Sequence, residues 1–468
     1  MKGRLALLIF AGTAAMLYFT YALVFASYAV VTTLQVTYAL VVIFLGALPC
    51  FIALSAKSEQ GLMPLLPLHG IFYASTFGLP VLFDKTDWLR MAESDISNSL
   101  LLTIFGLLFL YLGYYATSSI FKKLKSTQTT IIPAFKLIYV GWMLFLFYLL
   151  FQFFPFFRSI PSIEQLSAPL GYMSLGILFL AFLDRQLSFL HSLCIIFAIV
   201  FALLLKTLSG SLALTVLLVV FLAVLYWNIK RRIPWHFGIA IALFTVLLNP
   251  IKMEYRGTTW ADEGFQMTQY DKAILMGDIF FEYYRGANIL DSVSEDETTV
   301  NRLAHIVTFG HVVSLTPSAV PFWAGESYQT LWTSFIPRFL WSEKPKATVG
   351  QDFGHRYKLI SENNEFTSIN LPWLIEFYAN FGMFGVLGGM LFVGVFFRFI
   401  VHRLSVPVKA AHQHVLGVTV MFGLFYAESN FSLMVGGMLT TYIFFLLLLR
   451  LFSSKTPLSI IQGESLGR

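Results

Sequence analysis

Long runs of apolar residues, repeated along almost the whole chain, are the feature that most constrains its fold. A helix needs about 20 mostly apolar residues to cross a bilayer, because about 1.5 Å per residue must span a hydrocarbon core of about 30 Å. The repetition predicts an all-α integral membrane protein with about 12 transmembrane helices. The predicted spans are residues 5–27, 34–54, 62–83, 100–120, 135–157, 169–183, 187–205, 208–227, 235–249, 371–400, 413–428 and 431–452.

The composition excludes other classes of protein. Hydrophobic residues make up 57% of the 468 residues and charged residues only 12%, about half the charged share of soluble domains. A soluble globule, a disordered chain and a nucleic-acid-binding domain are therefore excluded, and the lipid bilayer is the expected surrounding. Cys50 and Cys194 both lie in apolar runs, so no disulfide framework is expected.

The charges are segregated along the chain. Residues 250–370 contain 15 of the 25 acidic residues but 10 of the 31 Lys and Arg, so this stretch carries −5 and the remainder +11. Basic loops are retained on the cytoplasmic side of a membrane. The segregation predicts that both termini are cytoplasmic and that the acidic stretch is external.

This topology divides the chain into four regions. Residues 1–249 hold transmembrane helices 1–9, residues 250–370 form a large external loop, residues 371–452 hold helices 10–12, and residues 453–468 form a cytoplasmic tail. Within the loop, apolar periodicity predicts helices at 271–293 and 301–316. The aromatic stretch 331–341 is too short to span and is expected at the membrane interface.

Several signatures of known chemistry are missing from the sequence. It contains no GxSxG, HExxH, Walker loop or CxxC pair, which argues against ATP-driven transport and against serine or zinc hydrolysis. The acidic cluster 295–297 is interpreted as a solvated loop tip, so no metal and no cofactor are expected. Secondary transport stays an alternative, although most ionisable residues near the spans lie toward helix ends, away from the midplane where coupling groups are retained.

Isolated cations stand among aromatic residues in the external loop. Arg256 follows the ninth predicted span, Arg338 lies in the segment IPRFLW, and Arg302 and His305 are three residues apart on one face of a predicted helix. The planar fork of a guanidinium binds phosphate oxygens in pairs. These arginines are candidate ligands of a pyrophosphate, although each alone also suits a salt bridge or a position at the lipid headgroups.

A polar pair opens the tenth predicted span. Glu376 and Asn380 are four residues apart and point the same way from an otherwise apolar helix. A desolvated carboxylate at the outer end of such a helix is a candidate general base, and His305 is a second candidate. Glu376 suits equally well a structural role as a partner of one of the loop arginines.

Three segments carry a resemblance to a known family. They are IPRFLWSEKP at 336–345, the pattern Gly350-x-x-Phe353-Gly-x-x-Tyr357, and the ExYxNFGxxG run from Glu376 to Gly385. Together with a large external loop before the last spans, they resemble the Wzy-type O-antigen, or oligosaccharide repeat-unit, polymerases. Those proteins are similar to the O-antigen ligases and share a membrane glycosyltransferase architecture of the GT-C kind.

The resemblance implies a function and partners. Such a polymerase of the bacterial inner membrane transfers a glycan from undecaprenyl pyrophosphate to another lipid-linked repeat unit at the periplasmic face, without a metal. Glu376 or His305 would act as the base. The expected ligands of the pyrophosphate or glycan are Arg256, Arg302, Arg338, Lys344, Tyr357 and Asn380. A chain-length regulator in the same membrane is a candidate further partner.

One departure from the family pattern concerns the small-residue turn at 208–211. Related proteins often carry an Arg in such a turn, whereas Leu212 follows it here and Lys206 is the nearby base. Two other functions stay open: an O-antigen ligase that uses lipid A-core as acceptor, and a flippase or transporter of lipid-linked oligosaccharide.

Overall fold

The computed structural model describes most of the chain. The described residues are 32–55, 64–82, 93–122, 132–154, 156–157, 166–183, 187–230, 232, 234–260, 267–286, 304–334, 336, 341, 343–344, 348–364, 367–405, 411–425 and 427–452. Every regular element among them is a helix. The predicted span at 5–27 and the tail at 453–468 lie outside the described residues.

The first half of the chain forms mainly long apolar helices. They are α2 (Thr33–Ser55), α3 (Leu65–Tyr73), which continues through the π-helix η1 (Ala74–Gly78) and the 3-10 helix η2 (Leu79–Leu82), α4 (Glu93–Ala116), α5 (Ser118–Lys122), α6 (Ala134–Phe153), α8 (Ser167–Leu183), α9 (Phe189–Thr207), α10 (Leu212–Lys230) and α11 (Trp235–Leu248).

The second half holds shorter helices before the last long ones. These are α12 (Lys252–Trp260), α13 (Gln269–Gly286), α15 (His305–Leu315), the 3-10 turn η5 (Glu326–Tyr328), α16 (Gln329–Ser334), α17 (Val349–Arg356), α18 (Trp373–Ser405), α19 (Ala411–Phe422) and α20 (Phe431–Phe452). The helices predicted at 271–293 and 301–316 correspond to α13 and α15.

Eight helical segments in the described part are long and apolar enough to cross a membrane. They are Thr33–Ala53, Leu65–Leu82, Ser94–Phe121, Phe135–Phe153, Phe189–Thr207, Leu212–Lys230, Trp373–Leu404 and Phe431–Phe452. Apolar side chains also point outward from the helices, as Phe189 (84% exposed) and Phe197 (67% exposed) do on α9. Large apolar side chains on the outside of a helix are typical of contact with lipid.

Three predicted spans correspond to shorter helices. α8 and α11 are apolar but have 17 and 14 residues. α19 has 12 residues and ends at Phe422, whereas the sequence predicted a continuous span over 413–428. The chain turns after Phe422, and the carbonyl of Leu424 accepts a hydrogen bond from the buried His69 ring at 2.8 Å. The prediction of twelve spans therefore stays a prediction.

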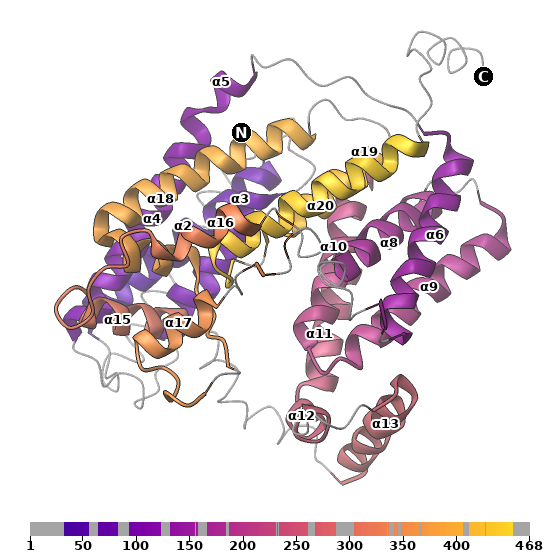
Figure 1. Cartoon of the computed structure of the whole chain (residues 1–468), viewed down its shortest axis with the longest axis horizontal. Coiled ribbons are helices and arrows are strands. Elements are labelled where there is room, and N and C mark those ends of the chain that lie inside the picture. Colours follow the sequence, from indigo (N-terminus) through magenta and orange to yellow (C-terminus); the bar gives the residue numbers. More distant parts are fainter. Residues whose placement is uncertain are drawn as a thin grey trace.

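The helices form two groups that α19 connects. α18 packs along α4, beside α2, α3 and α15, while α6, α8, α9, α10 and α11 form the second group (Figure 1). α19 contacts α8 and α10 on one side and α18 and α20 on the other. α4 and α18 approach closely because Gly113 has no side chain: a Cβ there would collide with the carbonyl oxygen of Leu391.

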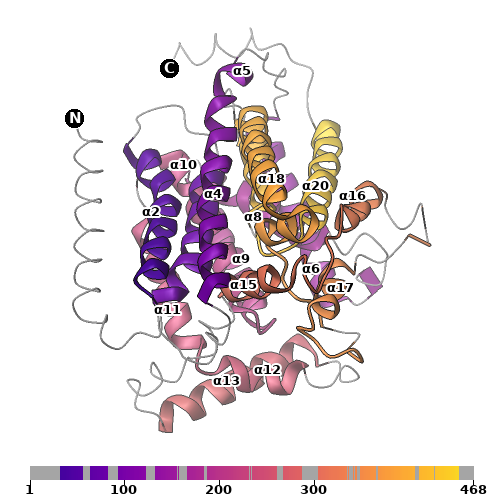
Figure 2. The same cartoon turned by 90° about the vertical axis from the view of Figure 1, so that its left-hand side faces the viewer.

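Four helices of the predicted external loop lie toward one end of the molecule, whereas α16 packs against α20. α12, α13, α15 and α17 lie at the same end in both views, and α5 lies at the opposite end (Figure 2). Within this end, α12 and α13 lie near the second helix group, whereas α15 and α17 lie near the first (Figure 1). Which side of a membrane this end faces stays a prediction from the charge distribution.

Candidate functional site

The site is organised around a break in the long helix α18. Gly382 has φ +61° and ψ −144° in the middle of this helix, a conformation that is essentially restricted to glycine. The break leaves carbonyl groups without helical partners. Two of them are satisfied from the loop that precedes η5, because Trp323 N–H donates to the Ala379 carbonyl at 2.9 Å and Ala324 N–H to the Asn380 carbonyl at 3.1 Å.

The loop segment 322–325 is seated directly on this break. The ring of Phe322 lies 2.9 Å from the position that a Cβ of Gly382 would occupy. Gly325, at φ +96°, donates its N–H to Oδ1 of Asn380 at 2.9 Å. Irregular backbone inside a spanning helix is tolerated where protein covers it and satisfies its polar groups. The covering loop leads immediately into η5, which carries Glu326 and Ser327.

Glu376 lies at the centre of a buried hydrogen-bond network. Its side chain has no exposed surface. Oε1 accepts a hydrogen bond from Ser327 Oγ at 2.7 Å, and Oε2 accepts one from the N–H of Phe431 at 2.7 Å. Phe431 is the first residue of α20, so the carboxylate also stabilises the amino end of that helix.

Asn380 completes the network. Its amide nitrogen donates to Ser327 Oγ at 2.9 Å and to the Glu376 carbonyl at 2.8 Å. The four-residue spacing of Glu376 and Asn380 therefore does place both side chains on one face, as the sequence predicted. Ser327 Oγ donates one hydrogen bond and accepts one, which leaves one lone pair able to accept another.

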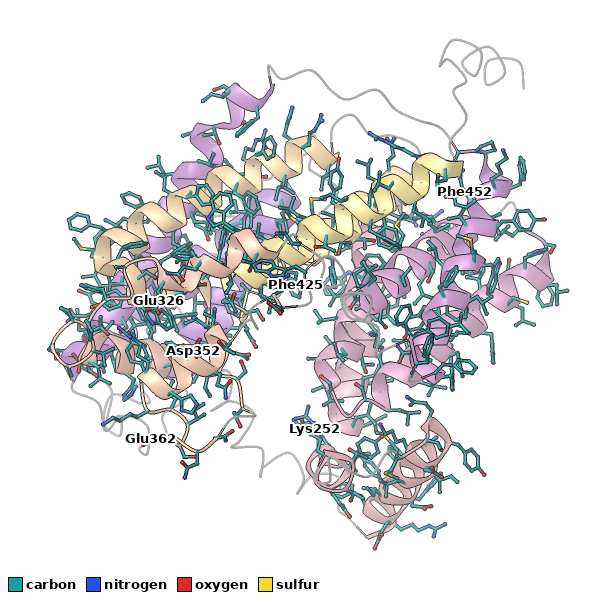
Figure 3. All side chains as sticks on the ribbon, in the orientation of Figure 1. Lys252, Glu326, Asp352, Glu362, Phe425 and Phe452 are labelled. Atoms are coloured by element: carbon teal, nitrogen blue, oxygen red, sulfur yellow. The ribbon has the colours of Figure 1, made fainter. Side chains whose placement is uncertain are left out.

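Ser327 also lines a polar cavity of about 430 Å³ between η5–α16 and α17. The volume lies within the range of about 300–1,000 Å³ that is typical of ligand pockets. Two carboxylates, Glu326 and Asp352, lie on this face of the molecule (Figure 3). The lining residues are Trp323, Glu326, Ser327, Gln329, Thr330, Thr348, Val349, Asp352, His355 and Arg356.

The wall formed by α17 is held in place by polar contacts. Thr348 Oγ1 donates to Oδ2 of Asp352 at 2.8 Å, at the start of the helix. One turn later, Nη2 of Arg356 donates to the Pro321 carbonyl at 2.6 Å, and its guanidinium lies 5.5 Å from the centre of the Trp323 ring. These contacts connect α17 to the loop that covers the break in α18.

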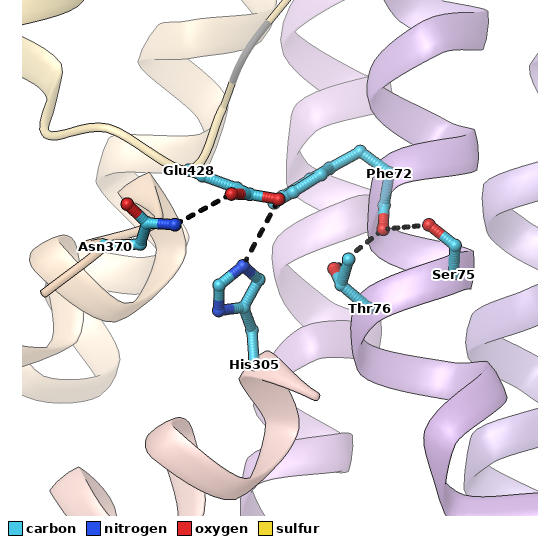
Figure 4. Close-up of polar contacts among 6 residues, drawn as sticks. All are labelled: Phe72, Ser75, Thr76, His305, Asn370 and Glu428. Atoms are coloured by element: carbon cyan, nitrogen blue, oxygen red, sulfur yellow. Dashed lines mark hydrogen bonds and ion pairs between the residues drawn. The ribbon is translucent and has the colours of Figure 1, made fainter. Parts of the chain in front are cut away.

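A second polar group contains His305. Its Nε2 lies 3.7 Å from Oε1 of Glu428, and Oε2 of Glu428 accepts a hydrogen bond from Asn370 at 2.8 Å (Figure 4). The His305 ring also packs near Phe72 and Phe77, with ring centres 5.9 and 6.1 Å away. The imidazole of His305 therefore lies between aromatic rings and the carboxylate of Glu428.

A third feature is an apolar groove of about 660 Å³ beneath α13. The groove is lined by residues of α6, α9, α11 and α13. α13 begins with Thr268 and Asp271, each of which accepts a hydrogen bond from the backbone N–H of the other. It is attached to α11 where Tyr284 donates its hydroxyl to the Leu247 carbonyl at 2.9 Å.

Arg256 contacts the turn 208–211, whose first residue lines this groove. Leu208 lines the groove, and Tyr255 donates its hydroxyl to the Leu208 carbonyl at 2.7 Å. Burial raises the pKa of Tyr255 to about 12, which keeps this donor protonated. Arg256 Nε donates to the Gly210 carbonyl at 2.7 Å. The small-residue turn at 208–211 has no arginine in its own sequence, but the guanidinium of Arg256 on α12 is hydrogen-bonded to it.

The other predicted site residues are placed differently. Arg302 and Arg338 lie outside the described residues. Lys344 donates from Nζ to the Ile336 carbonyl at 3.0 Å. Tyr357 is buried, its hydroxyl lies 2.8 Å from Thr316 Oγ1, and burial raises its pKa. It packs behind α17, and it is not among the lining residues of the polar cavity.

Several residues of these features had no role in the sequence interpretation. Ser327, Asp352, Arg356 and Trp323 line the cavity, and Glu428 faces His305. The four-residue spacing of Asp352 and Arg356 was a readable signal of a polar helix face. Across the described residues, no group of three or more His, Cys, Asp or Glu side chains forms a candidate metal site.

Comparison with known proteins assigns the chain to a family. Residues 120–460 match the model of a family described as a domain of unknown function, DUF8712. The chain belongs to this family. The match includes α6 and all later elements of the structure, and therefore the broken helix α18, the polar cavity and the groove beneath α13. No curated protein and no solved structure matches the chain.

Proposed function

We propose that this member of the DUF8712 family is a membrane glycosyltransferase that extends a glycan carried on a lipid pyrophosphate. In this proposal it polymerises undecaprenyl-pyrophosphate-linked repeat units of O-antigen or a related surface polysaccharide. It does so at the periplasmic face of the bacterial inner membrane, with both termini in the cytoplasm. The O-antigen polymerase resemblance of segments 336–345, 350–357 and 376–385 supports this class of reaction.

One structural observation carries the proposal most directly. A polar cavity able to hold a sugar is connected through the Ser327 hydroxyl to the buried carboxylate of Glu376, beside a break in an apolar helix. Discontinuous helices in membrane proteins commonly surround substrate sites. An ionisable group in such a helix is costly and is retained for a function.

Ser327 and Glu376 together can accept the proton that glycosyl transfer releases from the acceptor hydroxyl. The acceptor hydroxyl oxygen attacks the anomeric carbon of the donor sugar, and the bond from that carbon to the pyrophosphate oxygen breaks. The electron pair of that bond stays on the pyrophosphate oxygen, and the pyrophosphate departs still attached to its lipid carrier. The hydroxyl proton passes to Ser327 Oγ while the Ser327 proton passes to Glu376, so that charge and protons balance.

The groove beneath α13 supports a lipid-linked donor. It offers an apolar groove for an isoprenoid chain, and the guanidinium of Arg256 is hydrogen-bonded to the turn that contributes Leu208 to its lining. An arginine can stabilise the charge on a departing pyrophosphate without proton transfer. Arg302, Arg338 and Lys344 are proposed to add to this stabilisation.

His305 is the alternative base. It has a carboxylate neighbour in Glu428, whereas Glu376 has the hydrogen bond to a residue of the polar cavity. We assign the proton acceptor to Glu376 because its network reaches that cavity. In this assignment His305 and Glu428 hold the α19–α20 connection against α15.

The deciding experiment uses the full chain in liposomes with lipid-linked repeat units from the producing cell. A ladder of products that differ by one repeat unit is the expected result. Single transfer of preformed polymer to lipid A-core would instead identify a ligase. Movement of intact lipid-linked oligosaccharide across the bilayer, with no cleavage of the pyrophosphate bond, would identify a flippase and overturn the proposal.

A further inference from the structure

The charge of the polar cavity limits what it can bind. Its lining contains two carboxylates, Glu326 and Asp352, both on exposed residues, and one guanidinium, Arg356. No lysine is among the lining residues. Arg356 donates from Nη2 to the Pro321 carbonyl and lies against the Trp323 ring, so part of its donor capacity is already used by the protein. The two carboxylates and the one guanidinium of the lining together carry a formal charge of −1.

The remaining lining groups suit the hydroxyls of a sugar. Each carboxylate oxygen accepts hydrogen bonds, so Glu326 and Asp352 can each accept from neighbouring hydroxyl groups. Gln329 and Thr330 can both donate and accept. Hydrogen bonds to a charged acceptor are stronger than those between neutral groups. An uncharged sugar residue therefore suits this lining, while a carboxylate on the sugar would face the two carboxylates of Glu326 and Asp352 against the single guanidinium of Arg356.

We propose that the cavity is the subsite for an uncharged sugar residue of the acceptor glycan, and that Glu326 and Asp352 exclude acidic sugars from it. This inference rests on the proposed function where it identifies the bound glycan as the acceptor. The binding of an uncharged sugar to the cavity does not depend on that function. Specificity is a difference of affinities, and a like charge placed against the wrong ligand is an effective way to produce that difference.

The location agrees with an acceptor role. Ser327 is the lining residue whose hydroxyl reaches Glu376, and it retains one lone pair for a ligand hydroxyl. A sugar held by Glu326 and Asp352 would lie against Ser327, because all three residues line the same cavity. The two carboxylates are then specificity residues, distinct from the proton-accepting pair.

The test measures binding without transfer. Saturation-transfer NMR titrations are run on the full chain in detergent with three probes: diacetylchitobiose, which is neutral, the deacetylated chitobiose, which is cationic, and a disaccharide of glucuronic acid and N-acetylglucosamine. We expect saturable binding of the neutral probe and binding of the acidic probe weaker by about ten-fold or more.

The decisive variant is the double change Glu326→Gln and Asp352→Asn, which retains shape and removes both charges. We expect the ratio of neutral to acidic affinity to fall by about ten-fold. The matched control is Glu362→Gln, an exposed acid of the same outer region that does not line the cavity (Figure 3). It should leave the ratio unchanged.

A second variant tests the location. Thr330→Trp places a large ring in the cavity and should abolish binding of the neutral probe. The inference is overturned if the double variant keeps the wild-type ratio, if Thr330→Trp binds normally, or if only the cationic probe binds. A chain that binds the neutral probe but forms no product ladder would refute the proposed function alone. A chain that forms the ladder but shows no charge selectivity would refute this inference alone.

Discussion

Ser327 donates a hydrogen bond from its hydroxyl to Oε1 of Glu376 at 2.7 Å. The two residues are 49 positions apart, one in the 3-10 turn η5 and the other in the long apolar helix α18. This contact joins the lining of a polar cavity to a carboxylate that has no exposed surface of its own. It is the most direct structural reason to assign chemistry to Glu376.

The first prediction tests this connection. Ser327→Ala and Glu376→Gln should each lower the rate of glycan extension by about 10²–10⁴-fold, the usual contribution of a general base. The rate is measured on lipid-linked substrate at a temperature at which both variants are folded. Ser432→Ala is the control, because Ser432 donates to the backbone carbonyl of Ser327, at 3.3 Å, and makes no hydrogen bond to the Glu376 carboxylate within the described part of the chain. Normal extension by both variants would remove Glu376 from the mechanism.

The second prediction concerns the break in α18. Gly382→Ala should destabilise the fold by about 1–3 kcal/mol from backbone strain alone, and further because a methyl group would press on the Phe322 ring. Thermal unfolding in detergent measures the loss. Gly388→Ala is the matched control in the same helix, since a Cβ there meets no atom within 4 Å. Equal stability of the two variants would contradict the role of the break.

The third prediction concerns the cation at the turn 208–211. Arg256→Lys keeps the charge but loses the fork that can hold the Gly210 carbonyl and a phosphate together. Extension should fall about ten-fold or more at limiting donor concentration. Arg285→Lys, on the exposed surface of α13, should have no effect. If Arg256→Lys extends glycans normally, the pyrophosphate binds elsewhere, and Arg302→Lys and Arg338→Lys become the next variants to test.

The fourth prediction separates His305 from Glu376. His305→Asn should reduce extension much less than Glu376→Gln does, and the opposite ranking would move the base to His305. A double-mutant cycle with Glu428→Gln measures the coupling at 3.7 Å between the two side chains. Unfolding free energies should be non-additive by about 0.5–3 kcal/mol. Additivity would show that His305 and Glu428 act independently in the fold.

The fifth prediction concerns topology. In a background with Cys50 and Cys194 replaced by Ala, a cysteine in place of Glu362 should react with a membrane-impermeant maleimide in intact cells. A cysteine in place of Arg232, in the basic loop after α10, should react only after the membrane is permeabilised. The reverse pattern would invert the orientation and place the polar cavity on the cytoplasmic side.

Some features follow from the sequence because they depend on local pattern. Apolar runs predicted 34–54, 135–157 and 431–452 as helices, and α2, α6 and α20 correspond to them within a few residues. In a bilayer a spanning segment must satisfy its own backbone hydrogen bonds, so an apolar run of this length has few alternatives to a helix. The spacing of Glu376 and Asn380 likewise determined that they share a face.

Tertiary structure alone decided what those residues contact. The apolar run of the tenth predicted span continues through Gly382 and gives no sign of the break in the helix. The fold accommodates the break because the loop at 322–325 donates hydrogen bonds to carbonyl groups that the break leaves without helical partners. Three contacts join residues that are far apart in the sequence. The separation is 49 positions for Ser327 and Glu376, 46 for Arg256 and Gly210, and 123 for His305 and Glu428. Pairings at such separations are set by the packing of whole helices and leave no periodic signal in a single sequence.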